Sequence, residues 1–159
     1  MPEKFARKYD VPGIIKKYNE MRKDIERRKH EMKNIVVCIG NGLLSEAIIR
    51  MLKSSGEFKP FRVLVQKKSN VANDCKALSA DILLMDVSYA SGTTIETRLN
   101  EAKQVREKTP SCKLLMLCDE NAAPDIARAV ANAKKDGLID AFFYTSVTEK
   151  YLMAVLASL

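Results

Sequence analysis

The sequence of 159 residues has no tryptophan, one histidine and no apolar run near the ~18 residues that a membrane span needs. Its N-terminal segment is charged and contains no apolar core, so we expect neither a membrane span nor a secretory signal. The four cysteines, Cys38, Cys75, Cys112 and Cys118, form no CxxC pair. With a single histidine, this spacing argues against a zinc site and predicts buried, reduced thiols in a cytoplasmic protein.

The positive charge is concentrated near the N-terminus. Residues 1–33 carry 11 Lys and Arg against 6 Asp and Glu, a net charge of +5, whereas residues 34–159 carry 16 against 14. A basic segment can favour an acidic partner or nucleic acid. Because acidic residues are interleaved throughout it, we interpret this segment as a solvated helix face and as a weak nucleic-acid candidate only.

A helix is predicted from residue 12 to about residue 33, because residues 14–34 contain no glycine or proline. Five apolar residues and Arg28 recur with the alternating 4-3 spacing of a heptad seam, and the apolar members are Ile14, Tyr18, Met21, Ile25 and Met32. The seam spans fewer than three heptads, so two arrangements stay open: a short parallel helix pair in a dimer, or an extra helix docked on its own domain. We favour the dimer, and we expect the lone His30 to be exposed rather than a ligand.

From residue 34 onward, continuous apolar runs alternate with amphipathic segments. Strands are predicted over residues 34–40, 61–66, 81–87, 112–118 and 140–146, and helices over 41–56, 71–80, 94–110, 123–137 and 147–159. Short unbroken apolar runs are typical of strands buried on both faces of a parallel sheet. Residues 34–159 are therefore predicted to form a flavodoxin-like (βα)5 three-layer sandwich with strand order 2-1-3-4-5. Residues 1–33 are then a basic N-terminal helical extension.

The third predicted strand ends in a carboxylate. The sequence DILLMDV places four apolar residues directly before Asp86, which a small polar loop follows. Open parallel sheets bind their ligands at the carboxyl ends of the strands. We therefore expect the functional residues in the segments 39–42, 86–92, 118–121 and 144–147.

Together with this strand, the motifs IVVCIGNGLLSEAI and GLIDAFFYTSVTEKYLMAVL resemble the response-regulator receiver domains of two-component signalling. The resemblance covers residues 34–159 and is closest to the subgroup that precedes helix-turn-helix output domains. It implies a phospho-accepting aspartate at the position of Asp86 and an acidic pair after the first strand that holds Mg²⁺. It also implies a Thr or Ser at the end of the fourth strand and a Lys at the end of the fifth.

Only Asp86 matches that pattern. The acidic pair falls on Ile39 and Gly40, the Thr or Ser on Cys118, and the Lys on Thr145. Ile39 and Gly40 offer no side-chain oxygen to Mg²⁺, and no group offsets the repulsion between a phosphoryl group and Asp86. We therefore expect a degenerate pseudo-receiver without Mg²⁺ or enzymatic activity. Its Asp86 would be a structural acid, hydrogen-bonded to Thr145 or to N–H groups of the following loop.

Three alternatives remain for ligand binding. Asp119 and Glu120 follow the fourth strand and offer substitute carboxylates for a metal ion. The turn IGNGLL, with Gly40 and Gly42, matches a dinucleotide-binding turn weakly, since a third glycine is missing. Asn41 and Gly42 also begin a helix, where backbone N–H groups can face an anion.

The expected function is that of a signalling protein acting through protein–protein contacts. The contact face draws on residues 123–159, with a polar rim at Lys134, Lys135, Asp136, Glu149 and Lys150. A homodimer is the expected assembly, and contact with DNA would need an output domain that this sequence does not contain. The alternatives are a response regulator that accepts phosphate at Asp86, either alone or as a fragment of a DNA-binding transcriptional regulator, and a ligand-binding flavodoxin-like domain.

Overall fold

The computed structural model describes residues 12–65 and 70–159, and the chain divides into two compact units, Met1–Met32 and Lys33–Leu159. In the first unit, helix α2 (Pro12–Glu31) confirms the predicted N-terminal helix. Pro12 occupies its first position, where the fixed φ of proline suits a helix start. The side chain of His30 lies outside the described part of the structure, so its expected exposure stays a prediction.

The second unit alternates five strands with five helices. In chain order these are β1 (Lys33–Cys38), α3 (Gly42–Ser55), β2 (Phe58–Arg62), α4 (Val71–Ala77), β3 (Ile82–Asp86), α5 (Ile95–Lys108), β4 (Lys113–Cys118), α6 (Pro124–Lys135), β5 (Ala141–Tyr144) and α7 (Glu149–Ser158). The strands are parallel in the order β2-β1-β3-β4-β5, which confirms the predicted topology. Val37, Leu84 and Leu115 lie side by side in the three central strands.

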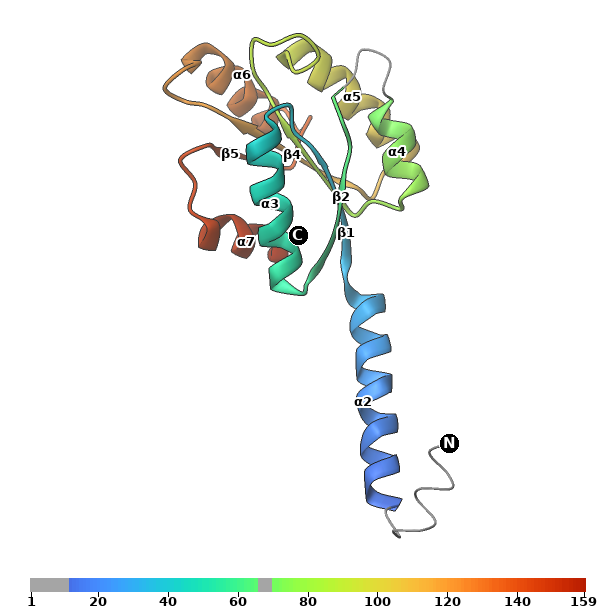
Figure 1. The fold of residues 1–159 in the computed structure, drawn as a ribbon. Helices are drawn as coiled ribbons and strands as arrows, with labels where there is room; N and C mark the ends of the chain where they lie inside the picture. The colour runs from blue at the N-terminus through green and yellow to red at the C-terminus, as the bar shows by residue number, and fades with distance from the viewer. Residues whose placement is uncertain (1–11, 66–69) are drawn as a thin grey trace. The chain divides into compact units, whose positions relative to one another are not determined.

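Helices cover both faces of the sheet (Figure 1). Helices α3 and α7 pack on one face, where Leu52 and Leu156 contact the apolar cluster that contains Val37 and Leu84. Helices α4, α5 and α6 pack on the other face, in a second cluster built around alternate strand residues such as Met85. Because successive strand residues point to opposite faces, each central strand contributes to both clusters, and its sequence is therefore continuously apolar.

The second strand lies earlier than predicted. Residues 61–66 were expected to form it, but β2 runs from Phe58 to Arg62 and includes Pro60. A proline cannot donate a backbone hydrogen bond, which favours a strand that starts after it. Strand β2 is the edge strand, however, and has only β1 as a neighbour, so the missing donor can face away from the sheet.

Side-chain caps set the start of the helices that border the strand ends. The Asn41 side chain accepts a hydrogen bond from Leu44 N and begins α3, and the Thr94 side chain accepts one from Thr97 N and begins α5. The cap at Thr94 fixes where α5 begins. It thereby fixes the position of Arg98, four residues later, at the carboxyl ends of the strands.

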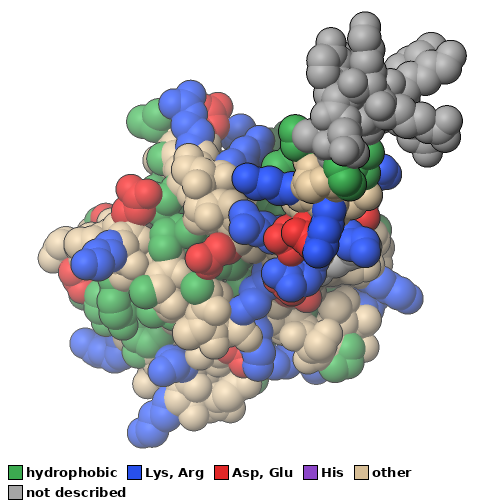
Figure 2. Space-filling view, turned by 90° about the horizontal axis from the view of Figure 1, so that it is seen from below, with side chains coloured by type: hydrophobic (Ala, Val, Ile, Leu, Met, Phe, Trp, Pro, Cys, Tyr) green, Lys and Arg blue, Asp and Glu red, His purple; other side chains and the backbone are tan. Residues whose placement is uncertain are grey.

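The four cysteines are free and buried, which confirms the prediction of buried thiols. None of the helices within residues 12–65 and 70–159 is long and apolar enough to cross a membrane. On the face drawn in Figure 2, Lys and Arg side chains are spread over the surface with Asp and Glu among them.

Candidate functional site

Asp86 lies at the carboxyl end of β3 with 16% of its side chain exposed. The Gly40 backbone N–H, which follows β1, donates to both carboxylate oxygens at 3.1 Å. The prediction that Thr145 or N–H groups of the following loop donate hydrogen bonds to Asp86 is wrong. Ser88 N and Thr93 N instead donate to carbonyl oxygens inside that loop, to Thr93 and Ala90 respectively.

The principal partner of Asp86 is Arg98, whose guanidinium is fully buried. Its Nη2 atom lies 2.9 Å from Asp86 Oδ1. Arg98 belongs to the second turn of α5, and its side chain reaches back beneath the ends of β1 and β3. A charge-assisted contact of this length is among the stronger hydrogen bonds that proteins form.

Each of the five N–H groups of the Arg98 guanidinium has an acceptor. Nε donates to the Asp86 carbonyl at 2.8 Å, and Nη2 donates to the Cys38 carbonyl at 2.9 Å as well as to the Asp86 carboxylate. Nη1 donates to Glu101 Oε2 at 2.9 Å and makes a longer contact of 3.5 Å to Cys38 Sγ. The guanidinium therefore joins the carboxyl ends of β1 and β3 through backbone and side-chain oxygens together.

Two carboxylates share this one buried cation. Glu101 lies one turn after Arg98 on α5 with 18% of its side chain exposed, and it pairs with the guanidinium on the side away from Asp86. An unpaired guanidinium in this position would carry a desolvation cost of several kcal/mol, which the two carboxylates offset. The neighbouring Cys38 thiol stays protonated, because burial raises its pKa while Arg98 lowers it to a lesser degree.

The loop between β3 and α5 closes over the carboxylate. Thr93 is buried, its hydroxyl lies 2.6 Å from Ser88 Oγ, and it donates to the Ala90 carbonyl. A Cβ atom added to Gly40 would lie 3.2 Å from the Thr93 methyl group and 3.4 Å from Asp86 Oδ2. Glycine at position 40 therefore allows the backbone to approach the carboxylate closely enough to donate its N–H.

The other pocket positions predicted from the sequence do not converge on Asp86. Ile39 is buried in the apolar cluster beneath α3 and α7. Cys118 is buried on the opposite face, where its thiol contacts the Phe143 carbonyl at 3.9 Å. Thr145 is exposed, and its backbone N–H donates to the Cys118 carbonyl. Of these four positions, Gly40 is the one whose backbone N–H donates to Asp86.

The alternative ligand residues have local partners. Asp119 accepts hydrogen bonds from Asn121 N and Ala122 N at 2.9 Å, and Glu120 accepts one from Ser146 Oγ at 3.1 Å. Within residues 12–65 and 70–159, no three His, Cys, Asp or Glu side chains gather in a way that suits a metal ion. The donor set around Asp86 likewise does not fit the Mg²⁺ of receiver domains, since its nearest charged neighbour is a cation and Ile39 and Gly40 add no oxygen ligand.

The role of Arg98 was not predicted from the sequence. Arg98 belongs to a helix whose inward apolar residues are Ile95, Leu99, Ala102 and Val105. Position 98 lies three residues after Ile95 and four before Ala102, so it falls on the same inward stripe. The available signal was a charged residue on that stripe, in the helix that follows a strand ending in a carboxylate. It could have predicted the contact between Arg98 and Asp86.

No protein-family model and no curated protein sequence matches this chain. Solved structures do match it. RcsB from Salmonella enterica serovar Typhimurium, bound to promoter rprA in the presence of the phosphomimetic BeF3−, gives a TM-score of 0.61 at 19% identity, covering 79% of this chain and 67% of that one. A LuxR-family DNA-binding response regulator from Staphylococcus aureus gives 0.59 at 13% identity, covering 80% and 98%.

A CheY-like response regulator receiver domain protein from Methanospirillum hungatei JF-1 gives a TM-score of 0.61 at 14% identity, covering 80% of this chain and 92% of that one. Structural similarity at such low sequence identity supports the fold alone. The chemistry of the site follows from the residues present in this chain. The sheet order, the helix layers and these likenesses agree. The part of the chain that begins at β1 has the fold of a response-regulator receiver domain.

Proposed function

We propose that this chain is a cytoplasmic signalling protein whose receiver-like domain acts through protein–protein contacts, without aspartyl phosphorylation and without an enzymatic step. The observation that carries the proposal is the contact of Asp86 with the buried guanidinium of Arg98. A phospho-accepting carboxylate must present an oxygen to the incoming phosphorus atom. Here Oδ1 is held by Arg98 and Gly40, and Oδ2 faces Gly40 N.

The charges around the site support the same proposal. Transfer of a phosphoryl group needs a positive charge close to the oxygens of that group, to offset their negative charge. Metal ions usually supply it from the open side of the pocket. Arg98 holds its charge beneath Asp86, with all five donors engaged. To turn toward a phosphoryl group, the guanidinium would have to give up its hydrogen bonds to the Cys38 and Asp86 carbonyls.

The test is incubation of the full chain with acetyl phosphate and Mg²⁺, followed by intact-mass measurement. We expect no hydrolysable adduct of about 80 Da, the mass of one phosphoryl group. A genuine receiver domain treated in parallel should gain the adduct and shows that the reagent is active. An adduct that forms on this chain and disappears in Asp86→Asn would overturn the proposal and support a phospho-accepting response regulator instead.

The proposed contact face consists of α6, β5 and α7. Its predicted rim residues are all exposed, and they are Lys134, Lys135, Asp136, Glu149 and Lys150. Tyr151, 61% exposed on α7, supplies an apolar side chain beside them. Interfaces commonly combine an aromatic anchor with a polar rim. Exchange of Tyr151 for Ala is expected to weaken partner binding more than exchange of Lys150 for Ala.

We further propose that the protein is a homodimer held by α2. The seam residues of this helix are exposed: Ile14 is 64%, Tyr18 57%, Met21 52% and Ile25 46% accessible. Light scattering on the full chain should give the mass of two chains, and removal of residues 1–33 should shift the equilibrium toward one. A full chain that stays monomeric at high micromolar concentration would contradict the proposed dimer without bearing on the Asp86 site.

A further inference from the structure

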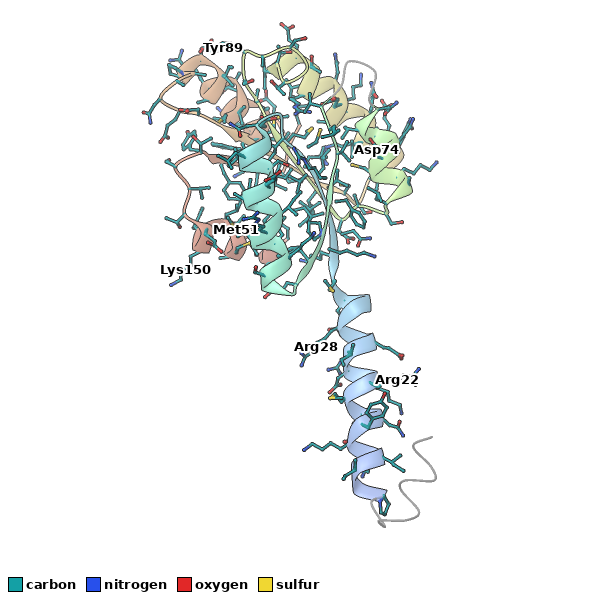
Figure 3. All side chains as sticks on the ribbon, viewed as in Figure 1. Arg22, Arg28, Met51, Asp74, Tyr89 and Lys150 are labelled. Carbon is teal, nitrogen blue, oxygen red and sulfur yellow. The ribbon has the colours of Figure 1, made fainter. Side chains whose placement is uncertain are left out.

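We infer that α2 pairs in antiparallel orientation with α2 of a second copy of this chain, with Arg28 of each copy over the partner's Tyr18. This inference rests on the proposed homodimer, and it replaces the parallel helix pair expected from the sequence with an antiparallel pair of defined register. It begins from the exposed seam, in which a basic residue, Arg28, occupies a position that the 4-3 spacing assigns to the interface. Arg28 and Arg22 leave α2 in different directions (Figure 3), so only some of its basic residues face the seam.

A parallel pair places each seam residue against the same residue of its partner. Arg28 would then face the partner's Arg28, which brings two guanidinium groups together at an interface that excludes water. Like charges brought together at an interface destabilise it. At the flanks, where positions five residues apart meet in a parallel pair, Lys17 would lie beside the partner's Arg22 and Asp24 beside the partner's Lys29, one repulsive and one attractive contact.

An antiparallel pair removes this conflict. With the two helices centred on position 23, the seam layers join Tyr18 to the partner's Arg28 and Met21 to the partner's Ile25. Ile14 lies opposite the partner's Met32, which directly follows the last residue of α2 and is half-buried. Every seam residue then has a partner of different identity. A guanidinium over the face of a tyrosine ring is attractive, and the attraction strengthens when the pair is removed from water. The register therefore uses Arg28 as a specific contact and keeps two apolar layers complete.

The flanking charges balance in both orientations, so the choice between them rests on Arg28. Lys17 approaches the partner's Glu31 on one side of the seam, and this opposite-charge contact occurs twice in a symmetric pair. Two like-charge approaches remain near the centre, Asp24 with the partner's Asp24 and Arg22 with the partner's Arg22. An ion pair within the same helix partly neutralises the charge of each of these residues. Arg22 Nε lies 3.4 Å from Glu26 Oε1, and Arg27 Nη2 lies 3.5 Å from Asp24 Oδ1.

Disulfide cross-linking distinguishes the two orientations. Tyr18→Cys and Arg28→Cys are made separately in the full chain, whose four native thiols are buried. In an antiparallel pair, position 18 lies ten residues, or about 15 Å, along the helix from the partner's position 18, too far for a disulfide. We expect no cross-linked dimer from either variant alone and a cross-linked dimer from an equimolar mixture after oxidation.

A second pair of variants leaves the Tyr18 and Arg28 contacts intact. Ile14→Cys and Met32→Cys should also cross-link only when they are mixed, since they share a layer in the antiparallel register. Self-cross-linking of Ile14→Cys or Tyr18→Cys would overturn the antiparallel orientation and leave the proposed dimer standing. A full chain that is monomeric by light scattering would overturn both, so the two failures are separable.

Discussion

The Nη2 atom of Arg98 lies 2.9 Å from Oδ1 of Asp86, and the guanidinium that carries it is completely buried. Arg98 enters from α5 and Asp86 ends β3, so the contact ties a helix to the edge of the sheet. It also fixes the orientation of Asp86, which among the predicted pocket positions is the one that matches the receiver motif. Two of the five predictions below concern this contact, and three concern other parts of the same domain.

Arg98→Met should lower the free energy of unfolding by about 3–5 kcal/mol, the usual cost of removing one partner of a buried ion pair. Methionine fills a similar volume but removes the guanidinium donors to the Asp86 and Glu101 carboxylates and to the Cys38 carbonyl, so that Asp86 keeps only the Gly40 N–H. Urea denaturation measures the change. Lys103→Met, an exposed site on the same helix, is the control and should stay within about 0.5 kcal/mol of the parent.

Arg98→Lys separates charge from geometry in the same assay. Lysine keeps the positive charge but has three donors on one nitrogen, so it cannot reach the Cys38 carbonyl, the Asp86 carboxylate and Glu101 together. We expect a loss of stability between those of the parent and Arg98→Met. Full stability in Arg98→Lys would mean that the charge alone, and not the five-donor arrangement, holds the site.

Gly92→Ala should destabilise the protein more than Gly56→Ala. Both glycines have positive φ, +87° at Gly92 and +71° at Gly56, so alanine is strained by about 1 kcal/mol at either position. A Cβ atom at position 92 would additionally lie 3.0 Å from Val65 Cγ1, whereas none of the described atoms lies within 4 Å at position 56. Equal losses in thermal denaturation would show that Val65 moves aside at no cost.

The phenol of Tyr89 should titrate at lower pH in Asp125→Asn than in the parent protein. The Tyr89 hydroxyl donates a hydrogen bond to Asp125 Oδ1, which raises the pKa of Tyr89 and lowers the pKa of Asp125. Ultraviolet absorbance of tyrosinate reports the titration, and the difference between the two proteins isolates this residue among the five tyrosines. Tyr89→Phe is the matched control, because it removes the phenol and should abolish the difference.

Stability should fall as the pH rises from about 9 to about 11. Burial raises the pKa of the Cys118 thiol to about 11, with Glu120 and Asp119 adding to the effect. Across this interval the unfolded chain loses the thiol proton and the folded chain keeps it, so deprotonation favours unfolding. Cys118→Ala should reduce the slope of unfolding free energy against pH by up to about one proton's contribution, 1.36 kcal/mol per pH unit. An unchanged slope would assign the effect to other groups.

The sheet could be predicted from the sequence because its central strands are buried on both faces. Runs such as the one from Ile82 to Met85 have no other plausible environment in a chain of this length, and their alternation with helices fixes the parallel order. The edge strand was harder to place. Strand β2 has one neighbour, so it is less buried than the central strands and tolerates Pro60, and the predicted start was displaced by three residues.

The site was predictable only as a location. Asp86 could be placed at the strand end from the apolar run before it, but its partners come from 46 residues earlier, at Gly40, and 12 residues later, at Arg98. A charged side chain on a helix is exposed in most cases, and its burial here depends on acceptors from Cys38, Asp86 and Glu101 that the sequence does not place together. Thr145 was expected at the carboxylate because it falls on the lysine position of the receiver motif, which fixes the edge of the sheet but not the direction of a side chain.

The cation at this edge is a covalent part of the chain. Every molecule carries it in the same amount from synthesis onward, and no dissociation equilibrium sets its occupancy, in contrast to an ion taken from solution. Dilution or a change in the surrounding solutes therefore leaves Arg98 in place, and only a movement of α5 away from the sheet can withdraw it. Separating Arg98 from Asp86 therefore requires the free energy of detaching α5 from the sheet. Amide hydrogen exchange along α5 measures that free energy.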